Sequence, residues 1–211
     1  MRAAPLLVTA LVGCAGFGGM GGHHHGGGGG CVATTDLSDD FSSGLSHWAT
    51  LGGSTPTISN TVGNPPPSAQ MASSAAMQDI PNLASFCGLT IAADIRQDSG
   101  FALMKVVIPG VAKIGVLQVY DTVTYYVLCN SAGCNYASES HGPDTAWHTY
   151  KFVIDTATFD GFWYKDGAVK YTVAGVGSYN SLRVNLGAFP ADSAGLGPSL
   201  AYFDNVVLSS P

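Results

Sequence analysis

Hydrophobic and polar residues alternate along several short segments of this chain. In residues 149–155 the large apolar side chains occupy every second position, a period of two that predicts a half-buried β-strand. Residues 182–187 repeat the pattern, and residues 162–173 predict a hairpin that turns at Asp166-Gly167. Three further predicted strands, rich in β-branched and aromatic residues, cover 101–108, 114–120 and 122–128. No segment shows an apolar stripe of helical period with caps, so the chain is expected to fold as an all-β sandwich or barrel.

Charged side chains are scarce: they make up 10% of the residues, against about 25% in average proteins. The surface must therefore consist mainly of serine, threonine, asparagine, glycine and alanine, as is common in extracellular β-proteins. The formal net charge is −6, and an acidic chain with so little lysine and arginine matches a phosphate backbone poorly. We therefore expect no nucleic-acid partner. We also expect no transmembrane helix, because no apolar run reaches about 18 residues.

The first 14 residues have the order of features found in an export signal. Arg2 is followed by an apolar run over 3–12, too short to span a bilayer, and residues 11–14 read Leu-Val-Gly-Cys. This ending resembles the lipobox of bacterial lipoproteins, which implies a signal peptide at 1–13 and lipidation of Cys14. By the same resemblance, Ala15 favours the outer membrane. The alternative is an ordinary secretory signal that is cleaved nearby.

A glycine-rich segment follows the cysteine and has almost no side chains able to form a core. We expect residues 14–31 to form a lipidated, flexible tether with a reach of about 20–25 Å. Residues 32–211 are expected to form one domain. The tether also contains His23, His24 and His25, which can bind a transition metal loosely but have no preformed site in a flexible coil.

Four cysteines remain after Cys14, and an even number in an exported chain predicts disulfides. Four cysteines allow three pairings. The short polar segment between Cys129 and Cys134 can close a hairpin, which favours a local bridge and leaves Cys31 to pair with Cys87. A zinc site is the alternative, but the sequence lacks the paired C-x₂-C spacing that such sites use.

Several short motifs occur in the order found in one family of sandwich domains. They are DDFSSGLSHW at 39–48, GNPPPS at 63–68, WHTY at 147–150, KDG at 165–167 and YFDNV at 202–206. Together they resemble the concanavalin A-like lectin and glucanase jelly roll, in its laminin-G-like variants, over nearly the whole domain. The resemblance implies an antiparallel two-sheet jelly-roll sandwich in which the first and last strands are neighbours. It does not assign an activity, because one fold carries many functions.

Catalysis is not expected from these residues. Glucanases of the family that the chain resembles use paired glutamates with an aspartate between them, and glycoside hydrolysis needs two carboxylates beside the bond. This chain has one glutamate, Glu139, while the adjacent Asp39 and Asp40 would point to opposite faces of a strand. Lyases of the same fold need a cation or amide, and the only arginines after the signal are Arg96 and Arg183. No G-x-S-x-G nucleophile elbow occurs.

Glycan binding would instead use aromatic ring faces beside polar groups. Four aromatic residues on the predicted strands are candidates: Trp163, Tyr125, Tyr126 and Tyr164. Among them, Trp163 is the best candidate for an exposed platform. The alternative is that it packs in the core, which is the role expected of Trp48 and Trp147.

A structural calcium ion is the candidate cofactor. Asp40, near the first strand, and Asp204, on the last strand, are expected to converge and to bind it together with carbonyl and water oxygens, since calcium takes about six to eight oxygen ligands. The alternative is that Asp40 caps a turn and Asp204 bonds to the backbone.

The leading interpretation is an exported lipoprotein, anchored to the membrane only by its lipid, with a non-catalytic carbohydrate-binding or adhesion domain whose partner is a glycan or surface polysaccharide. The second interpretation is a structural or protein-binding surface lipoprotein on the same fold. The third is a polysaccharide lyase or hydrolase that uses unfamiliar residues.

Overall fold

The computed structural model describes residues 34–80, 88–108, 112–155, 157–177, 182–189 and 199–210. Every regular element in these ranges is a β-strand, and the strands pair antiparallel in two sheets. They belong to one compact unit, Cys31–Pro211. The described residues contain no helix with the length and apolarity needed to cross a membrane. The signal, Cys14, the tether and its histidines all lie outside the described residues.

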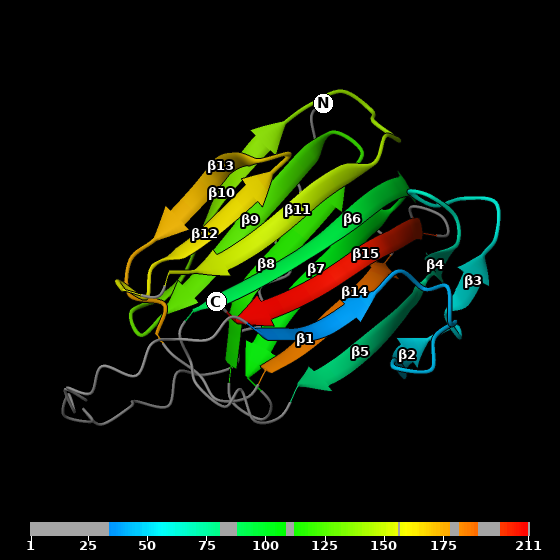
Figure 1. Ribbon diagram of the computed structural model, residues 1–211. Coiled ribbons are helices and arrows are strands. Elements are labelled where there is room, and N and C mark those ends of the chain that lie inside the picture. The colour runs from blue at the N-terminus through cyan, green and yellow to red at the C-terminus, as the bar shows by residue number, and fades with distance from the viewer. Residues whose placement is uncertain are drawn as a thin grey trace. The chain divides into compact units, whose positions relative to one another are not determined.

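The two sheets, called sheet A and sheet B, lie face to face as two layers (Figure 1). Sheet A has the order β13-β12-β11-β6-β15-β4-β3, with β1 also paired to β15. Its strands are β1 (Thr34–Asp39), β3 (Thr57–Ser59), β4 (Ser68–Ala72), β6 (Leu89–Ser99), β11 (His148–Ile154), β12 (Gly161–Lys165), β13 (Ala168–Val173) and β15 (Leu200–Ser210).

Sheet B has the order β10-β9-β8-β7-β14-β5-β2. Its strands are β2 (Ala49–Gly53), β5 (Ser74–Ile80), β7 (Phe101–Ile108), β8 (Ala112–Tyr120), β9 (Val123–Asn130), β10 (Gly133–Ser140) and β14 (Leu182–Phe189). The expected all-β, two-sheet antiparallel jelly-roll sandwich is thus confirmed. So is the pairing of first and last strands, since Asp39 on β1 lies opposite Val206 on β15.

Alternating side chains fill the space between the sheets. On β11, Tyr150, Phe152 and Ile154 are buried, as their period of two predicted. Trp163 on β12 is fully buried beside Phe152, with ring centroids 5.2 Å apart, so the expectation of an exposed platform at Trp163 is wrong. The physical reason is that the Trp163 side chain, like that of its strand partner Phe152, points toward sheet B. There the indole Nε1 donates to the Val127 carbonyl at 2.9 Å.

The other two tryptophans differ from each other. Trp48 packs in the core as expected and donates from Nε1 to Asp39 Oδ2 at 2.8 Å. Trp147 is only half-buried, because it precedes β11 in the segment that connects the two sheets.

The turn chemistry of the sequence is confirmed at the Asp166-Gly167 hairpin. Both residues have positive φ, 50° and 80°, as a two-residue turn between twisted antiparallel strands requires. Cys129 and Cys134 lie directly opposite each other on β9 and β10 and form the predicted disulfide, with an S–S distance of 2.06 Å. Cys31 and Cys87 lie outside the described residues, so their pairing stays a prediction.

Candidate functional site

Aromatic side chains form a continuous row on the outer face of sheet B. We call this set the aromatic row; its members are Phe189, Phe101, Tyr120, Tyr125 and Tyr136. Each neighbour within the row is close: the successive ring centroids are 5.7, 4.9, 5.8 and 5.9 Å apart. The members come from five adjacent strands, β14, β7, β8, β9 and β10.

Strand alternation explains why these rings face outward. On β7, Ala102 and Met104 are buried in the core, so Phe101 points to the opposite face. On β9, Thr124 and Tyr126 point inward, which leaves Tyr125 outside. Tyr136 is the most exposed ring of the row at 55%, and the other four are half-buried. The rings of the row are therefore packed against one another and are still partly accessible to solvent.

Only one of the four predicted binding aromatics lies in this row. Tyr125 is a member, and the polar residues Gln118 and Ser138 lie opposite it on the two neighbouring strands. Tyr126 is 1% exposed and faces the core, so it is not a surface residue. Tyr164 lies on the outer face of sheet A, with the Lys151 Nζ 4.4 Å from its ring centroid, and is thus separated from Tyr125 by the whole sandwich.

The sequence interpretation missed the other members of the row. Alternation alone can place Phe101, Tyr120 and Tyr136 on one face of their own strands. It cannot say which strand lies beside which, and the contact between Phe189 and Phe101 requires β14 to pair with β7 across a long stretch of chain.

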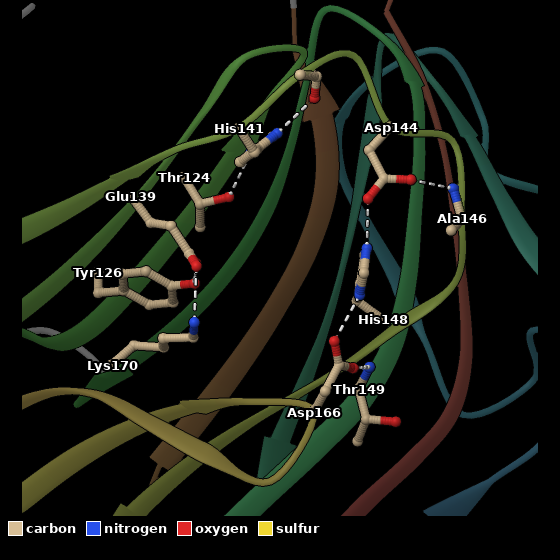
Figure 2. Close-up of polar contacts among 11 residues, drawn as sticks. Thr124, Tyr126, Glu139, His141, Asp144, Ala146, His148, Thr149, Asp166 and Lys170 are labelled. Carbon is tan, nitrogen blue, oxygen red and sulfur yellow. Dashed lines mark hydrogen bonds and ion pairs between the residues drawn. The ribbon is translucent and has the colours of Figure 1, made fainter.

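A second cluster of polar side chains lies between the sheets at the edge formed by β9, β10 and β13 (Figure 2). The Tyr126 hydroxyl donates to Glu139 Oε2 at 2.8 Å, and Lys170 Nζ donates to Glu139 Oε1 at 2.6 Å. Burial raises the pKa of Glu139, but the hydrogen bonds from Lys170 and Tyr126 outweigh it and hold the pKa below its usual value. The only glutamate of the chain is therefore an ion-paired carboxylate, unsuited to act as a general acid.

Two tyrosines of this region are kept neutral. Burial raises the pKa of Tyr126, and the hydrogen bond to Glu139 raises it further. Burial likewise raises the pKa of Tyr150, whose hydroxyl is close to Thr124. Neither phenol is poised to lose a proton near neutral pH, which disfavours the proton abstraction that a lyase needs.

His148 joins two separate segments on the other side of Figure 2. Its Nε2 lies 2.7 Å from Asp144 Oδ2 and its Nδ1 lies 2.7 Å from Asp166 Oδ2. Asp166 also accepts from the Thr149 N–H at 3.0 Å, and the hydrogen bonds from His148 and Ala146 lower the pKa of Asp144. His148 thus bridges Asp144 of the segment between β10 and β11 and Asp166 of the turn between β12 and β13.

The two arginines of the lyase hypothesis lie on different sheets. Arg96 lies on β6 and donates from Nε to Asp98 Oδ1 at 2.7 Å, whereas Arg183 lies on β14 in the other sheet. The cations in the cluster between the sheets are lysines, of which Lys170 is paired with Glu139.

The carboxylates expected to bind calcium have other partners. Asp40 is exposed and its Oδ1 accepts from the Ser42 N–H at 3.0 Å. Asp204 is buried opposite Asp94 on β6 and accepts from the N–H groups of Asn64 and Asn205. This matches the alternative of a turn cap and a backbone contact. Burial raises the pKa of Asp204, and the nearby carboxylates raise it further.

No group of three or more histidine, cysteine, aspartate or glutamate side chains with metal-binding geometry occurs in the described part of the chain. Calcium therefore stays a prediction from the sequence.

Known structures share this fold. A sialidase superposes with a TM-score of 0.59 and 16% identity, over 83% of this chain and 18% of the sialidase chain. The binding domain of botulinum neurotoxin serotype G superposes with a TM-score of 0.56 and 12% identity, over 83% of this chain and 47% of that chain. A botulinum neurotoxin type C structure, described with cell entry that depends on two ganglioside molecules, superposes with a TM-score of 0.59 and 9% identity, over 83% and 48%.

The chain spans less than half the length of each of these three chains. At such low identity the likeness defines a class by fold alone: a jelly-roll β-sandwich like those of the neurotoxin binding domains. No protein-family model and no curated protein sequence matches the chain. Membership of the concanavalin A-like family stays a prediction.

Proposed function

We propose that this protein is a non-catalytic carbohydrate-binding domain and that the aromatic row is its binding surface. The single observation that carries the proposal is the unbroken line of five rings on the solvent side of sheet B. Rings beside amide and hydroxyl groups suit a sugar, because C–H faces pack on aromatic carbon while hydroxyls need polar partners. Gln118 and Ser138 supply such polar groups next to Tyr125.

The compared structures support this direction without assigning a ligand. One is named a binding domain, one is described through an interaction with gangliosides, and one is a sialidase. Two of these descriptions mention binding or an interaction with gangliosides, and each belongs to that protein rather than to this chain.

The polar cluster between the sheets argues against catalysis. A retaining or inverting glycosidase needs one protonated and one ionised carboxyl group beside the substrate. Glu139 is held ionised by Lys170, and Asp144 is held ionised by His148. Tyr126 and Tyr150 stay protonated near neutral pH, so neither phenol is poised to take a proton from a substrate.

We further propose that the protein is exported and anchored through a lipid on Cys14, with residues 14–31 as the tether. The order of charge, apolar run and lipobox-like tetrapeptide supports this proposal. Mass spectrometry of the protein recovered from the membrane fraction of its host tests it. A lipidated N-terminal cysteine is the expected result, and an unmodified residue cleaved elsewhere would contradict it.

A glycan array probed with the purified full chain tests the binding function. Tyr125→Ala should abolish binding, whereas Tyr164→Ala should leave it unchanged. The two variants are matched, because both remove a half-buried tyrosine from an outer face, one from each sheet. Urea unfolding of both proteins shows whether each is folded under the array conditions.

The outcomes separate the two leading functions. Loss of binding only in Tyr125→Ala establishes the site on sheet B. No binding by the folded wild-type protein refutes the carbohydrate function and favours a protein-binding role. That second role has its own support, since the aliphatic side chains of Leu103 and Val127 lie on the same outer face.

A further inference from the structure

The aromatic row runs obliquely across sheet B. Phe189, Phe101 and Tyr120 lie opposite one another on β14, β7 and β8. Tyr125 lies one step further along, opposite Gln118, which precedes Tyr120 by two residues on β8. Tyr136 continues the shift, because it lies opposite Val127 rather than Tyr125. Four inter-strand steps of about 4.8 Å give the row a length of about 20 Å.

We infer that the aromatic row binds an extended, uncharged, β-linked hexopyranose chain lying obliquely across the strands, rather than a single terminal sugar. This inference rests on the proposed carbohydrate function and specifies its ligand class. The length of the row is the first reason: a monosaccharide covers one or two of the rings and leaves the others in water. Only a chain of several residues removes the whole row from solvent.

The second reason is that no charged side chain lies directly opposite a ring of the row in the described strand pairs. The described strand neighbours that lie directly opposite Tyr125 and Tyr136 are Gln118, Ser138 and Val127, and those of the remaining rings are aromatic. A carboxylated or sulfated chain would bring its charges onto apolar carbon without an ionic partner, which is unfavourable. An uncharged chain meets aromatic faces and two neutral polar side chains instead.

The geometry of the sugar linkage is the third reason. When hexopyranoses are joined through equatorial bonds at C1 and C4, as in β-1,4-linked glucose, the chain is an extended, flat ribbon with axial C–H bonds on both faces. An extended ribbon of this kind can follow the row from β14 to β10, whose successive ring centroids are 5.7, 4.9, 5.8 and 5.9 Å apart. A chain joined through an axial bond coils, and its successive sugar rings turn away from the row.

The edge of the sheet gives the fourth reason. β10 is the last strand of sheet B, and it carries the most exposed ring of the row, Tyr136. The row thus ends at an open sheet edge, past which a bound chain can continue. Recognition of internal segments of a polymer follows from this arrangement.

Calorimetric titration of the full chain with two length series tests the inference. The probes are cello-oligosaccharides and chito-oligosaccharides, each from the monosaccharide to the hexasaccharide. We expect at least one series to bind, with Kd falling by about tenfold or more with length, equivalent to ~1.4 kcal/mol. Tyr136→Ala should remove most of that gain while leaving the disaccharide Kd within about twofold of wild type. Tyr164→Ala is the matched control on the other sheet.

Each result is decisive. Equal Kd values along a series would mean that the site holds one sugar. A gain with length that does not depend on Tyr136 would mean that the chain binds away from the row. Either result would overturn the inference alone. Binding of acidic or axially linked glycans on the array, with neither neutral series bound, would also overturn it while leaving the carbohydrate function intact. Failure of every glycan on the array would instead refute the proposed function itself.

Discussion

The Tyr126 hydroxyl and the Glu139 carboxylate meet at 2.8 Å across neighbouring strands of sheet B, on the side that faces sheet A. Lys170 reaches the same carboxylate from β13 of the other sheet. Glu139 therefore links the two layers at this edge of the sandwich. A polar link of this kind contributes to stability only while the carboxylate is ionised.

The stability of the protein should accordingly depend on Glu139 at acidic pH. Its pKa is lower in the folded protein than in the unfolded chain, where a glutamate titrates near about 4.3. Its contribution is thus complete above that pH and is lost as the pH falls through the folded value. Urea unfolding should show a smaller loss of stability between neutral pH and about pH 3 for Glu139→Gln than for wild type.

Lys170→Met provides the companion measurement. The hydrogen bond from Lys170 is the largest of the interactions that lower the pKa of Glu139. This variant should therefore also lose less stability than wild type between neutral pH and about pH 3. Its free energy of unfolding at neutral pH should fall by about 1 kcal/mol, as is typical of partly exposed ion pairs. If both variants lose as much stability as wild type between neutral pH and about pH 3, other carboxylates control the acid dependence.

Substitution of Trp163 should affect folding rather than binding. The indole is fully buried and donates to Val127, so Trp163→Ala should lower the free energy of unfolding by about 3–5 kcal/mol. The exposed Tyr136→Ala should stay within about 0.5 kcal/mol of wild type. Chemical denaturation followed by circular dichroism measures both, and a Trp163→Ala protein of wild-type stability would contradict the core position.

The disulfide on the β9–β10 hairpin should contribute a modest amount. It closes a short loop with a sequence separation of 5, for which chain entropy predicts a stabilisation of about 2 kcal/mol. A double variant, Cys129→Ala with Cys134→Ala, should lose about this amount in urea unfolding. If the double variant loses almost no stability, the disulfide does not constrain the unfolded chain beyond what its residual strand pairing already does.

Chelation tests the predicted calcium ion. Each carboxylate oxygen of Asp94 and Asp204 accepts a hydrogen bond from an N–H or O–H group, from Asn64, Asn205 or Thr149. A calcium ion would bind through the remaining lone pairs of these oxygens, so the predicted site requires that EDTA lowers Tm. A lower Tm with EDTA that calcium but not magnesium restores would establish a calcium site on these strands.

The compared sialidase and neurotoxin structures add a fold and leave the ligand open. For this reason the decisive experiments are the glycan array and the paired tyrosine variants. They probe two outer faces of one sandwich with substitutions of equal size.

Local rules were sufficient for much of this structure. The period of two in residues 149–155 predicted a half-buried strand, and the Asp166-Gly167 turn followed from the positive φ that two-residue hairpins demand. The Cys129–Cys134 bridge was predictable because its loop is short. Alternation also required Tyr125 and Tyr126 to point to opposite faces, but it did not say which face would be the core.

The tertiary structure decided which of Tyr125 and Tyr126 faces the core, and it decided every contact that depends on strand order. Burial of Trp163 requires β12 to lie over β9, and the row requires β14 to lie beside β7. Glu139 meets Lys170 only because the edges of the two sheets coincide. These contacts join residues far apart in sequence, and they depend on how two whole sheets bury their apolar faces together. No local pattern carries that information, whereas periodicity, turns and short loops act through neighbours along the chain.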